Sequence, residues 1–217
     1  MHVDKVFIIN LERRTDRKEL ILKELARVGI KNYEFFPAIE PKTQATLNKW
    51  NPNFLKKRPA WLEGAPAEYY NKYRLGALGC LMSHAAVMQI ALKRNYKRIL
   101  ILEDDISFKT EKGFSNYKHL NTVLKHQYDL LRRKNQKLAA RFNNFDIIYL
   151  GGSCSDRTNM LQVTNNISRA QNIAGTFAYI LSNKSIRLIL NLLRRANVEI
   201  DKFKILGVLI QAKANYI

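Results

Sequence analysis

Three consecutive carboxylates follow an uninterrupted apolar segment. Residues 99–102 (ILIL) run directly into Glu103, Asp104 and Asp105. Ligands of open α/β sheets gather beyond the carboxyl ends of the strands, so these side chains would lie where a ligand binds. Adjacent carboxylates repel one another and cost free energy to desolvate, and a divalent cation offsets both effects. Their hard oxygen atoms suit Mn²⁺ or Mg²⁺, and such an ion can bridge the two phosphates of a diphosphate.

The alternation of side chains along a strand predicts which of these carboxylates act together. Extended backbone directs Glu103 and Asp105 to one side and Asp104 to the other. We therefore assign the metal contacts to Glu103 and Asp105. The alternative interpretation is a solvated turn after a strand. A Walker B strand is excluded, because it requires a phosphate loop of the form G-x-x-x-x-G-K-[ST] and the sequence contains none.

A basic segment, residues 10–17 (NLERRTDR), lies between an apolar segment and a helical pattern. Arg13 and Arg17 could reach a phosphate there, and the start of a helix offers free N–H groups to an anion. Arginines in a first helical turn are also common on ordinary protein surfaces. This segment therefore supports an anion site only in combination with other residues.

The histidines and cysteines do not by themselves predict a metal site. His84 lies within a helical pattern, where a single histidine is more often a hydrogen-bonded core residue than a ligand. His119 and His126 are seven residues apart without a further ligand beside them. Cys80 and Cys154 are too few for a disulfide framework or a zinc knuckle, so we expect both to be reduced and buried.

The elements that must position these residues follow the periodicity of an α/β fold. Residues 5–10 (KVFIIN) predict a buried strand, and residues 33–36 (YEFF) predict a second one. A helix is expected between them, with a capping box from Asp16 and Glu19 and an end at Gly29. Such a βαβ unit implies parallel strands.

The remaining chain continues this pattern after an irregular part. Residues 37–74 contain all five prolines and both tryptophans, which predicts a loop-rich insertion that either takes part in binding or packs on the core as a lid. Further helices are expected at 78–93, 117–142 and 184–195, and further strands at 98–102, 146–150 and 176–181. We expect one domain, because 217 residues are too few for two full-sized ones.

The charge of the chain favours anionic partners. Thirty-seven Lys and Arg against 18 Asp and Glu give a net charge of +19, which suits nucleotide phosphates, nucleic acid or acidic lipid, or serves solubility alone. Basic residues at 132–141 would lie on one helix face, for a membrane surface or a nucleic acid. Without a signal-peptide pattern or an apolar run near the ~20 residues that span a bilayer, we expect a cytoplasmic protein at the inner face of a membrane.

Taken together, the motifs resemble glycosyltransferase family 25, which includes bacterial lipooligosaccharide galactosyl- and glucosyltransferases and relatives that glycosylate collagen hydroxylysine. The order and spacing of the whole set carry this resemblance. Its members are residues 6–11 (VFIINL) with Arg13, Asp16 and Arg17, residues 78–84 (LGCLMSH), residues 101–105 (ILEDD), residues 175–182 (GTFAYILS) and residues 200–201 (ID).

The resemblance implies a GT-A type fold, with a Rossmann-like, mostly parallel sheet flanked by helices. It implies a metal-dependent, inverting transfer of a hexose, galactose before glucose, from a UDP-sugar to a glycan or lipid-linked glycan of the lipopolysaccharide kind. Glu103 and Asp105 would hold Mn²⁺ or Mg²⁺, and Asp201, or else Asp156, would be the catalytic base. The donor-binding residues would be Asn10, Leu11, Arg13, Arg17, Gly79, Ser83, His84 and Asp104.

Two alternatives to an active transferase are kept. One is a basic α/β module that binds nucleic acid, although no nucleic-acid motif is present and we expect no specific nucleic-acid partner. The other is an inactive homologue, because relatives continue beyond residue 217 and we expect a truncated carboxyl terminus that lacks an acceptor-binding segment.

Overall fold

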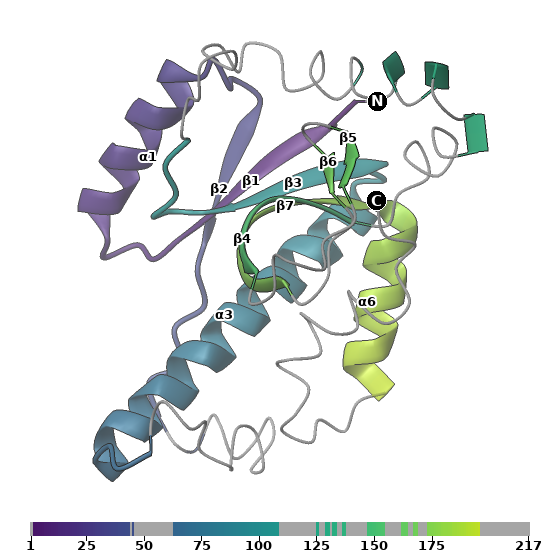
Figure 1. Ribbon diagram of the computed structural model, residues 1–217. Helices are drawn as coiled ribbons and strands as arrows, with labels where there is room; N and C mark the ends of the chain where they lie inside the picture. Colours follow the sequence, from purple (N-terminus) through teal and green to yellow (C-terminus); the bar gives the residue numbers. More distant parts are fainter. Residues whose placement is uncertain are drawn as a thin grey trace.

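The computed structural model describes residues 2–43, 63–108, 147–154, 162–164, 167–168 and 173–195, together with single residues and pairs between 125 and 137 and residue 45. Figure 1 shows a twisted sheet with helices on both sides. The predicted helix at 117–142 and the basic face at 132–141 lie mostly outside the described residues, although the described pieces at 129–130, 132–133 and 136–137 are helical.

Five strands form the sheet in the order β2-β1-β3-β7-β4. β1 pairs in parallel with both β2 and β3, whereas β7 is antiparallel to β3 and to β4. Four strands of this described sheet therefore share one direction, as the predicted mostly parallel α/β class requires. The bounds are β1 Lys5–Asn10, β2 Tyr33–Pro37, β3 Arg98–Glu103, β4 Ile147–Cys154 and β7 Ile173–Ser182, and a separate pair consists of β5 Gln162–Thr164 and β6 Ile167–Ser168.

α1 (Thr15–Arg27) covers one face of the sheet and confirms the predicted βαβ unit. Ile21 and Leu25 are buried against the sheet, and each contributes about 1.5–3 kcal/mol by leaving water. The left-handed Gly29, with φ 69°, follows the helix end. The predicted capping box is wrong: the helix begins at Thr15, so Asp16 lies inside the first turn instead of at the cap, where it accepts hydrogen bonds from Arg14, and no side chain caps the helix start.

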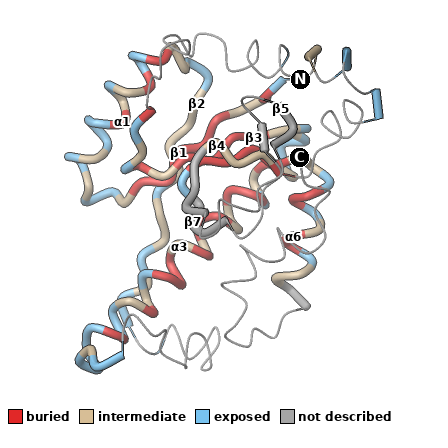
Figure 2. The backbone as a smooth tube through the Cα atoms, in the orientation of Figure 1, coloured by how far each residue is buried: buried red, intermediate tan, exposed pale blue. Residues whose placement is uncertain are grey.

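α3 (Ala67–Lys93) and α6 (Asn183–Arg195) cover the opposite face. α3 begins well before the predicted residue 78, directly after Pro66, so the last part of the predicted irregular insertion is helical. Figure 2 shows its buried positions along the side that faces the sheet. The strands β4 and β7 are also longer than predicted. β4 continues through Gly151 and Gly152 with an irregular register, and β7 begins at Ile173.

α3 also corrects the expectation that no segment is apolar enough to span a bilayer. Among the described residues it is the one helix that meets this criterion by length and composition. Its apolar side chains, including Leu78, Val87 and Met88, lie in the core that the sheet and α6 complete. Packing against the sheet therefore accounts for the apolar composition of α3.

The segment after β2 lies tightly between β1 and α3. Ala38 N donates to Asn10 O at 2.8 Å, and Ile39 N donates to Ser83 Oγ at 2.8 Å. At Gly79, a Cβ atom would collide with the carbonyl oxygen of Ile39 and lie 2.8 Å from Pro41 Cδ. Only a residue without a side chain lets α3 approach this backbone so closely.

We predict opposite effects for alanine at two glycines of α3. Gly79→Ala should destabilise the fold by about 1–3 kcal/mol, because the new methyl group must displace backbone. Gly76→Ala is the matched control, since no described atom lies within 4 Å of the place its methyl group would take, and alanine favours helix by about 0.5–1 kcal/mol. Urea denaturation of both variants measures the difference. Equal stabilities would show that the close approach at Gly79 is not a constraint.

Candidate functional site

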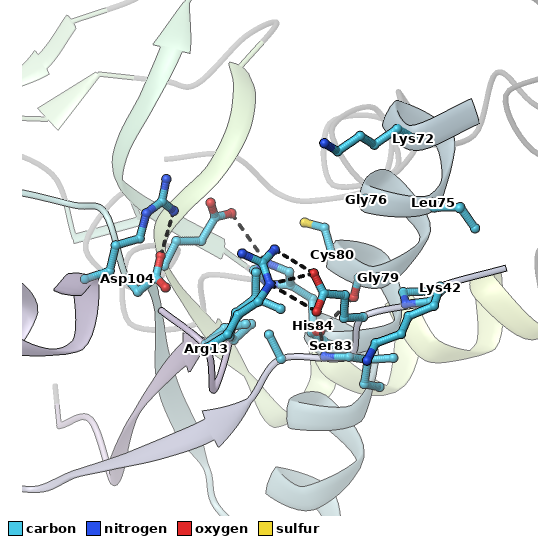
Figure 3. A pocket seen from close by; sticks show the side chains of 18 residues that line it. Arg13, Lys42, Lys72, Leu75, Gly76, Gly79, Cys80, Ser83, His84 and Asp104 are labelled. Carbon is cyan, nitrogen blue, oxygen red and sulfur yellow. Dashed lines mark hydrogen bonds and ion pairs between the residues drawn. The ribbon is translucent and has the colours of Figure 1, made fainter. Parts of the chain in front are cut away.

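A cavity of about 700 Å³ opens where β1 and β3 end beside α3 (Figure 3). The residues that follow β2 form its third side. Of the residues predicted from the sequence, those that line it are Leu11, Arg13, Arg17, Gly79, Ser83, His84, Glu103 and Asp104. Asn10 and Asp105 are not among the lining residues, but both contact residues that are. The structure thus gathers residues from distant parts of the sequence into one site.

The acidic residues do not continue the strand. β3 ends at Glu103, and Asp104 and Asp105 form a turn, so the alternation that placed Glu103 and Asp105 on one strand face does not apply. Asp104 is buried, with 7% of its surface exposed. Its carboxylate accepts hydrogen bonds from Asn10 Nδ2 at 2.8 Å and from Arg17 Nη1 at 3.0 Å. The same Arg17 nitrogen lies 2.9 Å from Asp105 Oδ2.

Asp104 and Asp105 therefore converge on a single cationic nitrogen. Two carboxylate oxygens within 3.0 Å of one positive centre form a group that also fits Mn²⁺ or Mg²⁺, both of which prefer oxygen ligands. Glu103 adds a third carboxylate at the cavity wall. The donor set is consistent with the expected hard divalent cation, and Arg17 would have to share or leave its place when the ion binds.

Glu103 itself faces α3. Its Oε1 lies 3.5 Å from His84 Nε2, and His84 Nδ1 is 2.6 Å from the hydroxyl group of Tyr179 on β7. Burial disfavours the imidazolium form of His84, but the Cys80 sulfur and the Glu103 carboxylate outweigh this effect and raise the pKa of His84 to about 9. Burial also raises the pKa of Tyr179, so its hydroxyl group remains protonated. The expectation of a buried histidine is confirmed, and that of a buried Cys80 holds only in part, because the residue is half-exposed.

Cationic side chains also line the cavity. Arg13 makes a bidentate pair with Glu40, with Nη2–Oε1 at 2.6 Å and Nε–Oε2 at 3.2 Å, and these hydrogen bonds lower the pKa of Glu40. Lys42 and Lys72 also line the cavity (Figure 3). Sequence reasoning missed both lysines and Glu40, because they lie in or next to the insertion, where no periodicity indicated which side chains face inward.

The segment that follows the acidic turn is held to α1 by hydrogen bonds at Phe108. Phe108 N donates to Glu24 Oε2 at 3.0 Å, and Arg27 donates both to Glu24 and to the carbonyl oxygen of Phe108. The Arg27 guanidinium group holds the pKa of Glu24 below its ordinary value of 4.5, against the opposing effect of partial burial. α1 thus positions the turn at both ends, through Arg17 and through Glu24.

Two further predicted site residues, Asp201 and Asp156, lie outside the described residues. They are the first and second candidates for the catalytic base.

Comparison with known proteins identifies the family. The sequence model of glycosyltransferase family 25 (LPS biosynthesis protein) matches residues 3–204. The chain belongs to this family. Its mixed five-stranded sheet with helices on both faces agrees with the GT-A type fold that the resemblance implied.

Three relatives illustrate the range of the family. A glycosyltransferase 25 family member of Drosophila melanogaster is 29% identical over 160 residues, or 70% of this chain and 25% of that protein. Procollagen galactosyltransferase 2 of Mus musculus is 28% identical over 131 residues, or 59% of this chain and 20% of that protein. Inactive glycosyltransferase 25 family member 3 of Homo sapiens is 27% identical over 153 residues, or 68% of this chain and 22% of that protein. The chain thus spans about a quarter or less of the length of these curated relatives.

The Glu24 contacts predict a pH-dependent contribution to stability. A carboxyl group whose pKa is lowered by folding stabilises the protein above its unfolded pKa, and this stabilisation is lost as the pH falls through the lower folded pKa. Glu24→Gln should therefore lower the free energy of unfolding at neutral pH, and the difference from wild type should shrink below pH 4.5. Urea denaturation over a pH series measures this.

Glu19→Gln is the control, since it removes a charge from an exposed position of the same helix. A Glu24→Gln effect of constant size from neutral pH to well below 4.5 would contradict the assignment.

Proposed function

We propose that this chain is a metal-dependent hexosyltransferase that moves galactose from UDP-galactose to a hydroxyl group of a glycan acceptor, with inversion at the transferred carbon. The observation that carries this proposal is the convergence of Asp104 and Asp105 on Arg17 beside a cavity that cationic side chains also line. Such a site offers carboxylates to a metal and guanidinium and ammonium groups to a diphosphate.

Each wall of the cavity has a different task in this mechanism. Arg13, Lys42 and Lys72 bind and orient the diphosphate of the donor, because they line the cavity and carry positive charge. Glu103 and Asp105, with Asp104, would hold Mn²⁺ or Mg²⁺, and the ion would supply positive charge that stabilises the departing UDP. Gly76 leaves room beside α3 for the hexose, because no described atom lies within 4 Å of the place a side chain would take there.

The acceptor hydroxyl group must lose its proton as it attacks the sugar. A carboxylate close to that hydroxyl group suits this role, and Asp201 and Asp156 remain our candidates for it. Both lie outside the described residues.

Galactose and the acceptor class are proposed from the relatives and the charge. The mouse relative is named a procollagen galactosyltransferase, which favours galactose over glucose here. The family description refers to LPS biosynthesis, and the net charge of +19 suits an anionic, lipid-linked glycan at the inner face of a membrane. We therefore propose a lipooligosaccharide or lipopolysaccharide acceptor.

A second candidate function is favoured by one relative. The human protein that matches 68% of this chain is named inactive, so donor binding without transfer is an alternative outcome for the same site. Measurement of UDP release from UDP-galactose with Mn²⁺, compared with UDP-glucose and GDP-sugars, separates the two. UDP release with one selected donor supports the transferase, and donor binding without release supports the inactive homologue.

Asp105→Asn should remove the metal-dependent part of UDP binding. Calorimetry with and without Mn²⁺ should show that Mn²⁺ raises the affinity of the wild-type chain for UDP, and that the variant loses at least about tenfold of this gain. The fold should stay intact, because nearly half of the Asp105 side chain is exposed and its ion pair with Arg17 is open to water on both sides.

The control is Glu68→Gln, which removes a negative charge from an exposed position that does not line the cavity. It should keep the full Mn²⁺ effect. An Asp105→Asn chain with wild-type metal dependence would overturn the assignment of Asp105.

A further inference from the structure

Cys80, His84 and Glu103 form a second group of ligand atoms, separate from the Asp104 and Asp105 pair. Cys80 and His84 are four residues apart on α3, so their side chains lie on one helix face. Glu103 reaches the same place from the end of β3. One ligand atom from each of the three lies within 4.8 Å of the other two.

The distance between His84 and Glu103 suits shared coordination better than a hydrogen bond. Nε2 and Oε1 are 3.5 Å apart. Two ligands at about 2.1 Å from a tetrahedral Zn²⁺ lie about 3.4 Å from each other. Among the described residues, Nε2 of His84 is a buried side-chain atom that makes no hydrogen bond of good geometry, although His84 is only 1% exposed. Its polar neighbours are the Glu103 carboxylate and the Cys80 sulfur, and a metal ion between the three would satisfy them together.

Tyr179 completes the arrangement from the other side of the ring. Its hydroxyl group lies 2.6 Å from His84 Nδ1, and the whole residue is buried. Histidine ligands commonly use their second nitrogen in a hydrogen bond that fixes the tautomer and the orientation of the ring. When Nδ1 donates to Tyr179, the lone pair of Nε2 points toward Cys80 and Glu103.

The chemistry of these ligands selects the ion. Thiolate and imidazole ligands favour Zn²⁺ and similar borderline metals over Mg²⁺ or Mn²⁺. The three residues also line the cavity, and Figure 3 shows Cys80 and His84 projecting from α3 toward it. A tetrahedral ion held by three side chains would thus keep its fourth position open to the cavity.

We propose that Cys80, His84 and Glu103 bind one Zn²⁺ ion, with Tyr179 orienting His84 and the fourth position facing the cavity. This site does not rest on the proposed sugar transfer, because Zn²⁺ binding by these three side chains requires neither donor nor acceptor. Glu103 is common to both groups, so Zn²⁺ at this site withdraws it from the Asp104 and Asp105 pair.

Cobalt substitution tests the site directly. The full chain, freed of metal with a chelator and kept reduced with a phosphine, is titrated with Co²⁺ and then with Zn²⁺. We expect one Co²⁺ per chain, a near-ultraviolet band from thiolate-to-cobalt charge transfer, strong visible bands typical of tetrahedral Co²⁺, and loss of all bands when Zn²⁺ displaces it. Calorimetry gives the Zn²⁺ affinity.

Variants assign the ligands. Cys80→Ser should abolish the charge-transfer band and weaken Zn²⁺ binding by about 100-fold or more, whereas Cys154→Ser, which changes the other cysteine of the chain, should leave both unchanged. Tyr179→Phe should keep the band and weaken binding about 10–100-fold, as expected for a residue that orients a ligand. Asp105→Asn should leave Zn²⁺ affinity unchanged.

Several results would overturn the proposal. They are the absence of a thiolate-to-cobalt band in the wild-type chain, a band that survives Cys80→Ser, and a Zn²⁺ affinity that depends on Asp105 rather than on Cys80. Circular dichroism of the metal-free variants checks that each is folded. We expect Cys80→Ser to fold, because serine differs from cysteine by a single atom and the position is half-exposed.

Discussion

The buried carboxylate of Asp104 is the constraint around which the site is arranged. A charged group with so little contact with water requires compensating hydrogen bonds and an opposite charge, and it obtains them from Asn10 at the end of β1 and from Arg17 on α1. These contacts fix the ends of β1 and β3 and the first turns of α1 relative to one another. The cavity lies at this junction, so these contacts position its acidic wall.

The parts of this fold that depend on local patterns could be predicted from the sequence. β1, α1 and β2 have clear periodicities, and the glycine after α1 indicates where that helix ends. The start of α3 was missed, although Pro66 followed by residues compatible with helix was a usable signal. The capping box failed because α1 begins one residue before Asp16, which places this side chain within the first turn and not at the cap.

The details of the site depend on partners that the sequence does not reveal. β3 ends where its neighbours end, since β1 pairs with it up to Glu103 and β7 up to Leu102. Asp104 and Asp105 therefore lie beyond the end of the strand. The sequence did not show where β3 ends, so the alternation of side chains was wrongly extended to these two residues. In the same way, the spacing of Cys80 and His84 is visible on one helix, but the approach of Glu103 requires the packing of α3 on the sheet.

The position of β7 has a consequence for how the chain folds during synthesis. β7 follows β3 and β4 in sequence, yet it lies between them in the sheet. Until residue 182 has left the ribosome, the edge of β3 that β7 will cover is open, and unpaired edges of this kind invite association with other chains. The contacts that close the sheet join residues 98–102 to residues 178–182, and pairing over such separations slows folding. The nascent chain thus depends on β7 to connect β3 with β4. If synthesis stops before β7, both strands lack the strand that lies between them in the sheet.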